Sequence, residues 1–176
     1  MHLQQLDPSK ALAYRALMLD AFALHPDAFT SSLAERAALP MAWWVSRLGA
    51  QPDAQEVVWG AFVGGTLAGV AGLAFETREK ARHKATLFGM YVPTAFRHHG
   101  VGRALVDALL AHARDRPGVE VVQLTVTAGN LGAERLYRSA GFVPYGLEPM
   151  AVRVGDTFVS KTHLWCRLDA QAVQAG

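Results

Sequence analysis

A loop rich in glycine and basic residues lies between a hydrophobic strand pattern at 87–92 and a strongly helical segment. Backbone N–H groups at a helix N-terminus have no partner within the helix, and the helix dipole adds positive potential there. Glycine lets an anion approach the backbone because no Cβ is in the way. The loop therefore predicts a phosphate site. Its residues are Arg97, His98, His99, Gly100, Val101, Gly102 and Arg103.

The spacing of the two glycines also fits other roles. A glycine-rich turn that lets a helix and a strand pack closely would show the same pattern. The loop lacks the Gly-Lys-Ser/Thr ending of a Walker A motif. It also lacks a complete Gly-x-Gly-x-x-Gly dinucleotide fingerprint and an acidic residue at the expected distance beyond it. The loop alone predicts a phosphate without identifying what carries it.

Asn130 and Tyr137 form a second candidate constellation. Asn130 follows the strand pattern at 123–127 and stands where a helix begins, which is the N-cap position. Tyr137 comes about two helical turns later, so it shares a helix face with Asn130 and Ala133. A cap and a half-buried core aromatic would explain both residues. The chemical alternative is a phenol that protonates a leaving group.

The pattern of apolar residues and turn signals predicts the elements that position these groups. Helices and hairpins alternate with a strand–helix–strand unit, which indicates one mixed α/β (α+β) domain over residues 1–176. A Gly64-Gly65 turn joins two strands, Gly155-Asp156 joins two more, and Pro40 breaks a helical region. Helices are expected at 9–24, 31–49, 100–114 and 130–139, and strands at 2–6, 57–63, 66–75, 83–92, 119–126, 142–154 and 157–168.

The composition excludes several classes of protein. Of 176 residues, 51% are hydrophobic and 18% charged, and the net charge of +2 is too small to indicate a nucleic-acid partner. We see neither a signal peptide nor an apolar stretch long enough to span a membrane. Cys166 is the single cysteine and lies in an alternating strand pattern, so we expect a buried structural thiol. The absence of an intrachain disulfide favours the cytoplasm.

These segments together resemble the GNAT superfamily of acyl-CoA-dependent N-acetyltransferases. The resemblance is strong over 87–142, where the motifs occur in the order and at the spacing of the family. Two flanking segments also resemble a bacterial subgroup. The central motifs are Met90-Tyr91-Val92, Arg97-x-x-Gly100-x-Gly102-Arg103, Asn130 and Leu136-Tyr137-x-x-x-Gly141-Phe142, and the flanking ones are Leu24-His25-Pro26-x-Ala28-Phe29 and Gly146-x-Glu148-Pro149.

The resemblance implies a fold and a set of roles. The fold would be a mixed, mostly antiparallel sheet with a central splay and helices on both faces. Acetyl-CoA would be the cosubstrate, with no metal. The backbone of Met90, Tyr91 and Val92 would bind its pantetheine arm, and the amides of 97–103 would bind its pyrophosphate. Asn130 would contact the cofactor near the pantetheine, and Tyr137 would protonate the departing thiolate.

The implied reaction is direct attack of a neutral amine on the thioester, whose carbonyl an N–H such as that of Met90 would polarise. The family commonly uses a carboxylate to take the proton from the amine. Two strand positions that often carry this glutamate hold Thr86 and Thr125. The remaining candidates for the base are Glu76, His83 and Glu148, and a water chain ending at backbone carbonyls is the further alternative.

The acceptor is less well defined than the donor. It would be a small-molecule or peptide amine. Phe29, Trp43 and Trp44 are expected to be packing residues, and the resemblance gives Phe29 and the segment after it a second role as a wall of the acceptor groove. A homodimer through 158–168 would fit the family. The alternatives are a protein N-terminal or longer-chain acyltransferase and a non-catalytic acyl-CoA sensor, although a sensor has no need of the acid Tyr137.

Overall fold

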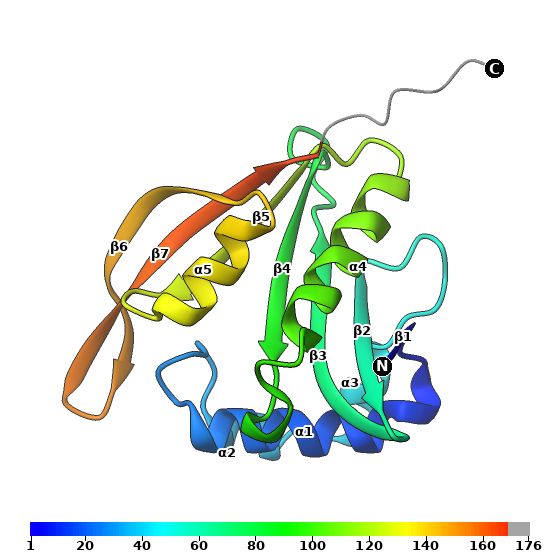
Figure 1. Ribbon diagram of the computed structural model, residues 1–176, viewed down its shortest axis with the longest axis horizontal. Coiled ribbons are helices and arrows are strands. Elements are labelled where there is room, and N and C mark those ends of the chain that lie inside the picture. Colours follow the sequence, from blue (N-terminus) through cyan, green and yellow to red (C-terminus); the bar gives the residue numbers. More distant parts are fainter. Residues whose placement is uncertain (169–176) are drawn as a thin grey trace.

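One seven-stranded sheet forms the centre of the protein in a computed structural model that describes residues 1–168 (Figure 1). The strand order is β1-β2-β3-β4-β5-β7-β6. All neighbouring strands are antiparallel except β4 and β5, which are parallel. The strands are β1 (His2–Gln5), β2 (Glu56–Val63), β3 (Thr66–Phe75), β4 (Lys84–Tyr91), β5 (Val121–Thr127), β6 (Val143–Val154) and β7 (Thr157–Arg167).

The helices begin and end close to where the sequence signals place them. Ser32 caps α2 in a reciprocal capping box with Glu35, and Pro40 stands at the N-cap of α3. No helix within 1–168 is both long enough and apolar enough to cross a bilayer. The helical elements are η1 (Pro8–Lys10), α1 (Ala11–Leu24), α2 (Leu33–Ala37), α3 (Met41–Ser46), η2 (Thr94–Phe96), α4 (Val101–Asp115) and α5 (Leu131–Ser139).

Helices cover both faces of the sheet, as expected. Alternate residues of a strand point to opposite faces, so Val57 and Val58 on β2 belong to two different apolar clusters. One cluster contains the buried face of α4, including Leu105 and Leu109. The other contains α1 and α3, with Trp44 at its centre and 1% exposed. The two clusters fix the sheet from both sides and hold the strands that carry the site.

The predicted central splay lies between β4 and β5. Their parallel pairing covers three residue pairs, Lys84–Val121, Ala85–Val122 and Thr86–Gln123, and then stops. On its other edge β4 stays paired with β3 as far as Tyr91, and β5 stays paired with β7 as far as Thr127. Figure 1 shows the two strands separating from this short contact. The outer pairing of each strand therefore keeps the gap open.

A β-bulge interrupts β4 inside the splay. Val70 of β3 pairs with Tyr91 and Gly72 pairs with Phe88, so Gly89 and Met90 together face one residue of β3. Gly89 has a φ of 60°, a left-handed conformation that glycine adopts without steric cost. The bulge changes the direction of the β4 backbone at the position where the resemblance expects a pantetheine arm.

The last two strands form a long hairpin that extends from the sheet (Figure 1). Cys166 is buried there, as expected. The side chains of Phe158 and Trp165 are 51% and 39% exposed. A second copy of the chain covering this surface stays a prediction, because the structure contains a single chain.

Candidate active site

The splay opens into a pocket of about 470 Å³. Strands β4 and β5 form its two sides, α5 borders β5, and α1, α2 and α3 close the remaining side. Phe29 and the residues after it contribute to the wall, as expected for this segment. The lining residues are Tyr14, Met18, Phe22, Ala28, Phe29, Thr30, Ser31, Arg36, Trp43, Trp44, Arg47, Glu56, Ala74, Thr86, Leu87, Phe88, Gly89, Met90, Thr125, Val126, Thr127, Asn130, Ala133, Leu136, Tyr137 and Lys161.

The free edge of β4 lies along this pocket. Beyond Thr86 the β5-facing peptide groups of β4 have no strand partner, because the pairing with β5 has ended. Met90 lines the pocket, whereas the ring of Tyr91 is buried in the apolar cluster of α1. Val92 is half-buried against α4. An unpaired strand edge can bind an extended, amide-containing ligand in the manner of an added strand.

The glycine loop has the backbone geometry of an anion site. Gly100 has a φ of 76° and α4 has no side-chain cap, so the N–H groups of its first turn are available. His98, which is exposed, also has a positive φ of 66°. Alternating left-handed residues of this kind point successive N–H groups towards one concavity. A Cβ on Gly100 would have no atom within 4 Å, so the space beside it is open.

Gly102 allows a helix and a strand to pack closely, which the sequence analysis gave as the alternative to a phosphate site. A Cβ there would lie 3.2 Å from a Leu136 methyl and 3.4 Å from the Met90 methyl. Contacts of this length are tight, so a side chain at this position would push α4 away from α5 and β4. The two glycines therefore have different functions: Gly100 opens the loop and Gly102 allows close packing.

The two arginines of the loop have partners within the protein. The Arg97 Nε donates to the Val92 carbonyl at 2.9 Å, and its Nη2 lies 3.1 Å from the His25 Nε2. The Arg103 Nε pairs with the Asp107 carboxylate at 2.8 Å, and its Nη1 donates to the Ser139 carbonyl at 3.1 Å. His99, which also belongs to the loop, is exposed. These bonds orient both guanidiniums and use only part of their donors, so the loop offers free N–H groups from its backbone and from the remaining arginine nitrogens.

Asn130 and Tyr137 both line the pocket from α5. The Asn130 Oδ1 accepts a hydrogen bond from the Ala133 N–H at 3.1 Å, so it is the expected N-cap. Tyr137 is 5% exposed and packs edge-to-face on Phe142 at a centroid distance of 5.8 Å. Burial raises the pKa of the Tyr137 phenol above its ordinary value. The phenol therefore keeps its proton at neutral pH and can donate it.

The structure does not bring the candidate bases to the pocket. Glu76, His83 and Glu148 are absent from its lining. The Glu148 carboxylate lies 2.8 Å from the His163 Nε2. Thr86 and Thr125 do line the pocket, and the Gln123 amide donates to the Thr86 hydroxyl at 3.3 Å. Whether any of the three candidates acts as a base stays a prediction.

The sequence analysis missed the charged groups of the pocket. Arg36 comes from α2, Arg47 follows α3, and Glu56 begins β2. The Arg47 Nη2 pairs with the Glu56 carboxylate at 3.2 Å. None of the three belongs to a motif or shows a periodicity that would single it out. Their proximity to β4 comes from the packing of α1 and α3 on the sheet.

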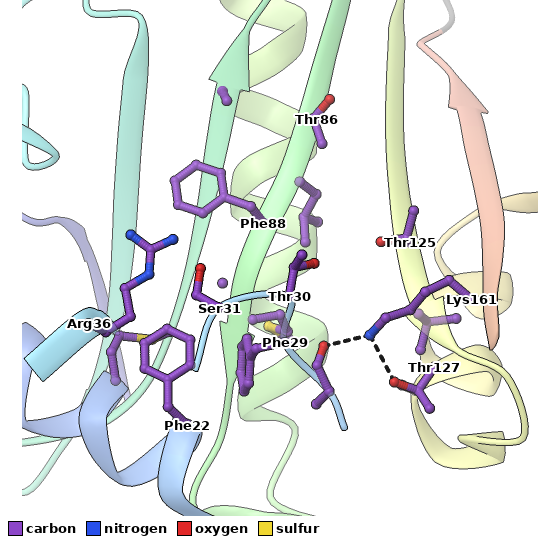
Figure 2. A pocket seen from close by; sticks show the side chains of 18 of the residues that line it. Phe22, Phe29, Thr30, Ser31, Arg36, Thr86, Phe88, Thr125, Thr127 and Lys161 are labelled. Atoms are coloured by element: carbon purple, nitrogen blue, oxygen red, sulfur yellow. Dashed lines mark hydrogen bonds between the residues drawn. The ribbon is translucent and has the colours of Figure 1, made fainter. Parts of the chain in front are cut away.

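The sequence analysis also missed Lys161 of β7. This lysine connects the loop after α1 to the sheet. It is 4% exposed, and its Nζ donates to the carbonyls of Asp27 and Ala28 at 3.1 and 2.9 Å. A third bond of 3.0 Å reaches the Thr127 hydroxyl, which itself donates to the Asp27 carbonyl at 2.8 Å. Burial lowers the pKa of Lys161. Figure 2 shows this lysine entering from the side of β5 and β7, opposite Arg36.

Comparison with known proteins identifies relatives for this arrangement. Residues 17–142 match the family model described as the acetyltransferase (GNAT) family. The fold is similar to that of a GNAT-family acetyltransferase from Streptococcus pneumoniae, with a TM-score of 0.84, 21% identity, and coverage of 95% of this chain and 98% of the other. It is also similar to yncA, a putative acetyltransferase from Salmonella typhimurium with its cofactor acetyl-CoA, with a TM-score of 0.79, 22% identity, and coverage of 96% and 94%.

A curated relative matches over a shorter segment. It is the [ribosomal protein bS18]-alanine N-acetyltransferase of Escherichia coli (strain K12), which is 38% identical over 69 residues. The matched segment is 39% of this chain and 46% of the length of the relative. The chain therefore spans about half the length of the curated relatives that it matches.

Replacing Lys161 by Met should loosen the loop at 25–32. The change keeps an unbranched apolar stem and removes the ammonium with its three hydrogen bonds, so we expect the free energy of unfolding to fall by about 1.5–3 kcal/mol. Urea denaturation and hydrogen exchange of residues 25–32 would measure the effect. Lys84→Met, at a half-buried lysine that begins β4, is the control. Equal exchange in the wild type and in Lys161→Met would contradict the tether.

Proposed function

The chain belongs to the acetyltransferase (GNAT) family, and from this premise we propose that it transfers the acetyl group of acetyl-CoA to a primary amine by direct attack in a ternary complex. The observation that carries the proposal is the splay between β4 and β5. It provides a free strand edge that leads from the anion loop to a pocket, and Tyr137 lines that pocket. Acetyl-CoA has its groups in the matching order: a pyrophosphate for the loop, a pantetheine arm with amides for the strand edge, and a thioester for the pocket.

The cofactor would be bound mainly by backbone groups. The N–H groups at 98–103 would bind the pyrophosphate, and the free edge of β4 from Leu87 to Val92 would bind the amides of the pantetheine arm. The side chain of Asn130 already accepts a bond from its own helix, so its contact with the arm would use its remaining donors. The thioester would then lie beside Met90 and Tyr137.

In the reaction, the amine nitrogen forms a bond to the thioester carbon and the carbon–sulfur bond breaks. A backbone N–H near the bulge at Met90 would stabilise the oxyanion of the tetrahedral intermediate. Tyr137 would give its phenolic proton to the leaving sulfur, and its raised pKa favours the protonated form that this role needs. The products are the acetylated amine and free CoA.

The proton on the incoming amine would be lost before attack. Glu56 is the one carboxylate among the described residues that line the pocket, and it is paired with Arg47 at 3.2 Å. We therefore propose that the acceptor reacts from its neutral fraction in water, without a dedicated side-chain base. This proposal replaces Glu76, His83 and Glu148, which do not line the pocket.

One other class of acceptor, one other acyl donor and one other function are compatible with the fold. The curated relative acts on the alanine of a ribosomal protein, which supports a peptide amine as an alternative acceptor. A longer acyl group is a second alternative. A non-catalytic acyl-CoA sensor is the third, and Tyr137 argues against it because binding alone needs no proton donor.

Replacing Gly100 by Val should weaken binding of CoA by about tenfold or more, because the β-branched side chain is strained at positive φ and occupies the anion site. Calorimetry would measure the dissociation constant for CoA and for pantetheine, which has no pyrophosphate. Gly118→Val is the matched control, since Gly118 has a φ of 82°, has no atom within 4 Å of a Cβ, and lies beyond the other end of α4. Equal losses for CoA and pantetheine would contradict the assignment of the loop.

Replacing Tyr137 by Phe should lower kcat by about 10²-fold and leave the dissociation constant of acetyl-CoA within about twofold. The phenyl ring preserves the contact with Phe142 and removes only the proton donor. Release of free thiol, followed with a chromogenic reagent, measures kcat. An unchanged kcat would remove Tyr137 from the mechanism, and acetyl-CoA binding without thiol release for any amine would favour the sensor.

The pH profile should follow the acceptor. Below the pKa of the amine, kcat/KM should rise about tenfold per pH unit, levelling near pH 8 for an α-amine and near pH 10 for an alkyl amine. The raised pKa of Tyr137 means that its proton is lost only above the ordinary phenol range, so no fall is expected below about pH 10. A midpoint that is the same for both amines would assign the titration to a protein base instead.

A further inference from the structure

The pocket has an excess of positive charge on its lining. Three of its side chains are cationic, Arg36, Arg47 and Lys161, and one is anionic, Glu56. A pocket that binds a neutral thioester and a neutral amine has no need of this excess. The charges therefore point to a further group on one of the two substrates.

Two of the three cations have acceptors within the protein. The Lys161 ammonium donates to three oxygens, and Arg47 pairs with Glu56. Arg36 forms no ion pair with any residue of 1–168. The neighbouring Glu35 carboxylate accepts a bond of 2.7 Å from the Ser32 N–H in the cap of α2. The unmatched positive charge of the pocket is therefore that of Arg36.

The Arg36 guanidinium is held in place by aromatic rings and not by acceptors. Its Cζ lies 4.6 Å from the ring centre of Trp43 and 5.8 Å from that of Phe22. Its Nε is buried and has no hydrogen-bond partner. Burial and then the charge of Arg47 lower the pKa of Arg36. Figure 2 shows the head group of Arg36 beside the pocket and across from Lys161.

A purely structural role would not explain this arrangement. Stacking on Trp43 stabilises the side chain, but a buried donor without an acceptor costs a free energy of similar size. Arg47 already occupies the same tryptophan ring, with its Cζ 4.7 Å from the centre. The charge of Arg47 therefore acts on Arg36 and is unfavourable. An anion bound at Arg36 would compensate both charges.

We propose that the acceptor amine carries a carboxylate, and that Arg36 binds this carboxylate in the pocket with Arg47 beside it. The inference rests on the proposed acetyl transfer and names the substrate class of the same site. The planar fork of a guanidinium matches a carboxylate in a bidentate geometry. Phe22, Phe29 and Phe88 also line the pocket and would provide apolar contacts for the body of the acceptor. A polyamine would bring further positive charge to the two arginines, so we do not expect it to be an acceptor.

The test compares acceptors that differ only in the carboxylate. Thiol release from acetyl-CoA would be followed with phenylalanine, phenylalaninamide and phenethylamine, and with the dipeptides Ala-Glu and Ala-Gln, both amidated at the C-terminus. We expect kcat/KM for the acceptors with a carboxylate in reach of Arg36 to exceed that of the matched neutral amines by about tenfold or more at equal concentrations of free amine. A preference for phenylalanine over phenylalaninamide and phenethylamine would identify a free amino acid as the acceptor. A preference for Ala-Glu over Ala-Gln would identify an acidic peptide.

Arg36→Gln should raise KM for the preferred acid by about tenfold or more, and should leave KM for its neutral analogue within about twofold. Arg36→Lys should retain an intermediate preference, because it keeps the charge without the fork. The matched control is Arg15→Gln, since the Arg15 Nη2 donates to the Ala37 carbonyl next to Arg36 but Arg15 does not line the pocket. The control should resemble the wild type with every acceptor.

A binding measurement separates failure of this inference from failure of the proposed function. With CoA present, the N-acetylated form of the acid should raise the melting temperature of the wild type and of Arg15→Gln but not of Arg36→Gln. Equal use of acids and neutral amines, or equal losses with both in Arg36→Gln, would overturn the inference and leave acetyl transfer intact. If no amine is acetylated although acetyl-CoA binds, the proposed function fails, and the melting temperatures alone decide whether Arg36 binds a carboxylate.

Discussion

The parallel contact between β4 and β5 ends after three residue pairs, and the remaining features of the site depend on that short contact. Peptide groups inside a protein are normally paired, because an unpaired buried donor or acceptor is costly. Here β3 and β7 hold β4 and β5 from outside, so the sheet stays intact while its centre is open. The open edge is available to a ligand with amides of its own. The same separation makes room for the side chains that approach from α5 on one side and from α2 and α3 on the other.

The two sides of the gap use different chemistry. On the side proposed for the donor, the groups that would bind it belong to the backbone, at the free edge of β4 and at the start of α4, and each loop arginine already makes hydrogen bonds within the protein. On the side proposed for the acceptor, they would be side chains, with Arg36 and the aromatic rings around it. Backbone groups suit a cosubstrate that many related proteins share. Side chains suit an acceptor that differs from one relative to the next, because they can change while the fold is kept.

The donor side could be predicted from the sequence, and most of the acceptor side could not. Gly100, Asn130 and Tyr137 lie in one continuous stretch of local signals: a strand end, a helix start and a helix face. The structure confirms the splay, the caps and the two glycine turns. Arg36, Glu56 and Lys161 are far apart in the chain and come together only through packing of α1 and α3 on the sheet and through insertion of β7. No spacing or periodicity in the sequence indicates that these three residues line one pocket, because their proximity depends on tertiary contacts.

The position of β7 determines how early the site can form during synthesis. This strand is the last described element of the chain, yet it lies between β5 and β6 and not at the edge of the sheet. Its Lys161 fixes the loop after α1, from more than a hundred residues earlier. A nascent chain that has already released α4, β5 and α5 from the ribosome has its phosphate loop and its phenol, but the acceptor wall is not yet anchored. Anchoring of the loop after α1 thus depends on β7, which is synthesised later than the elements that would hold the donor.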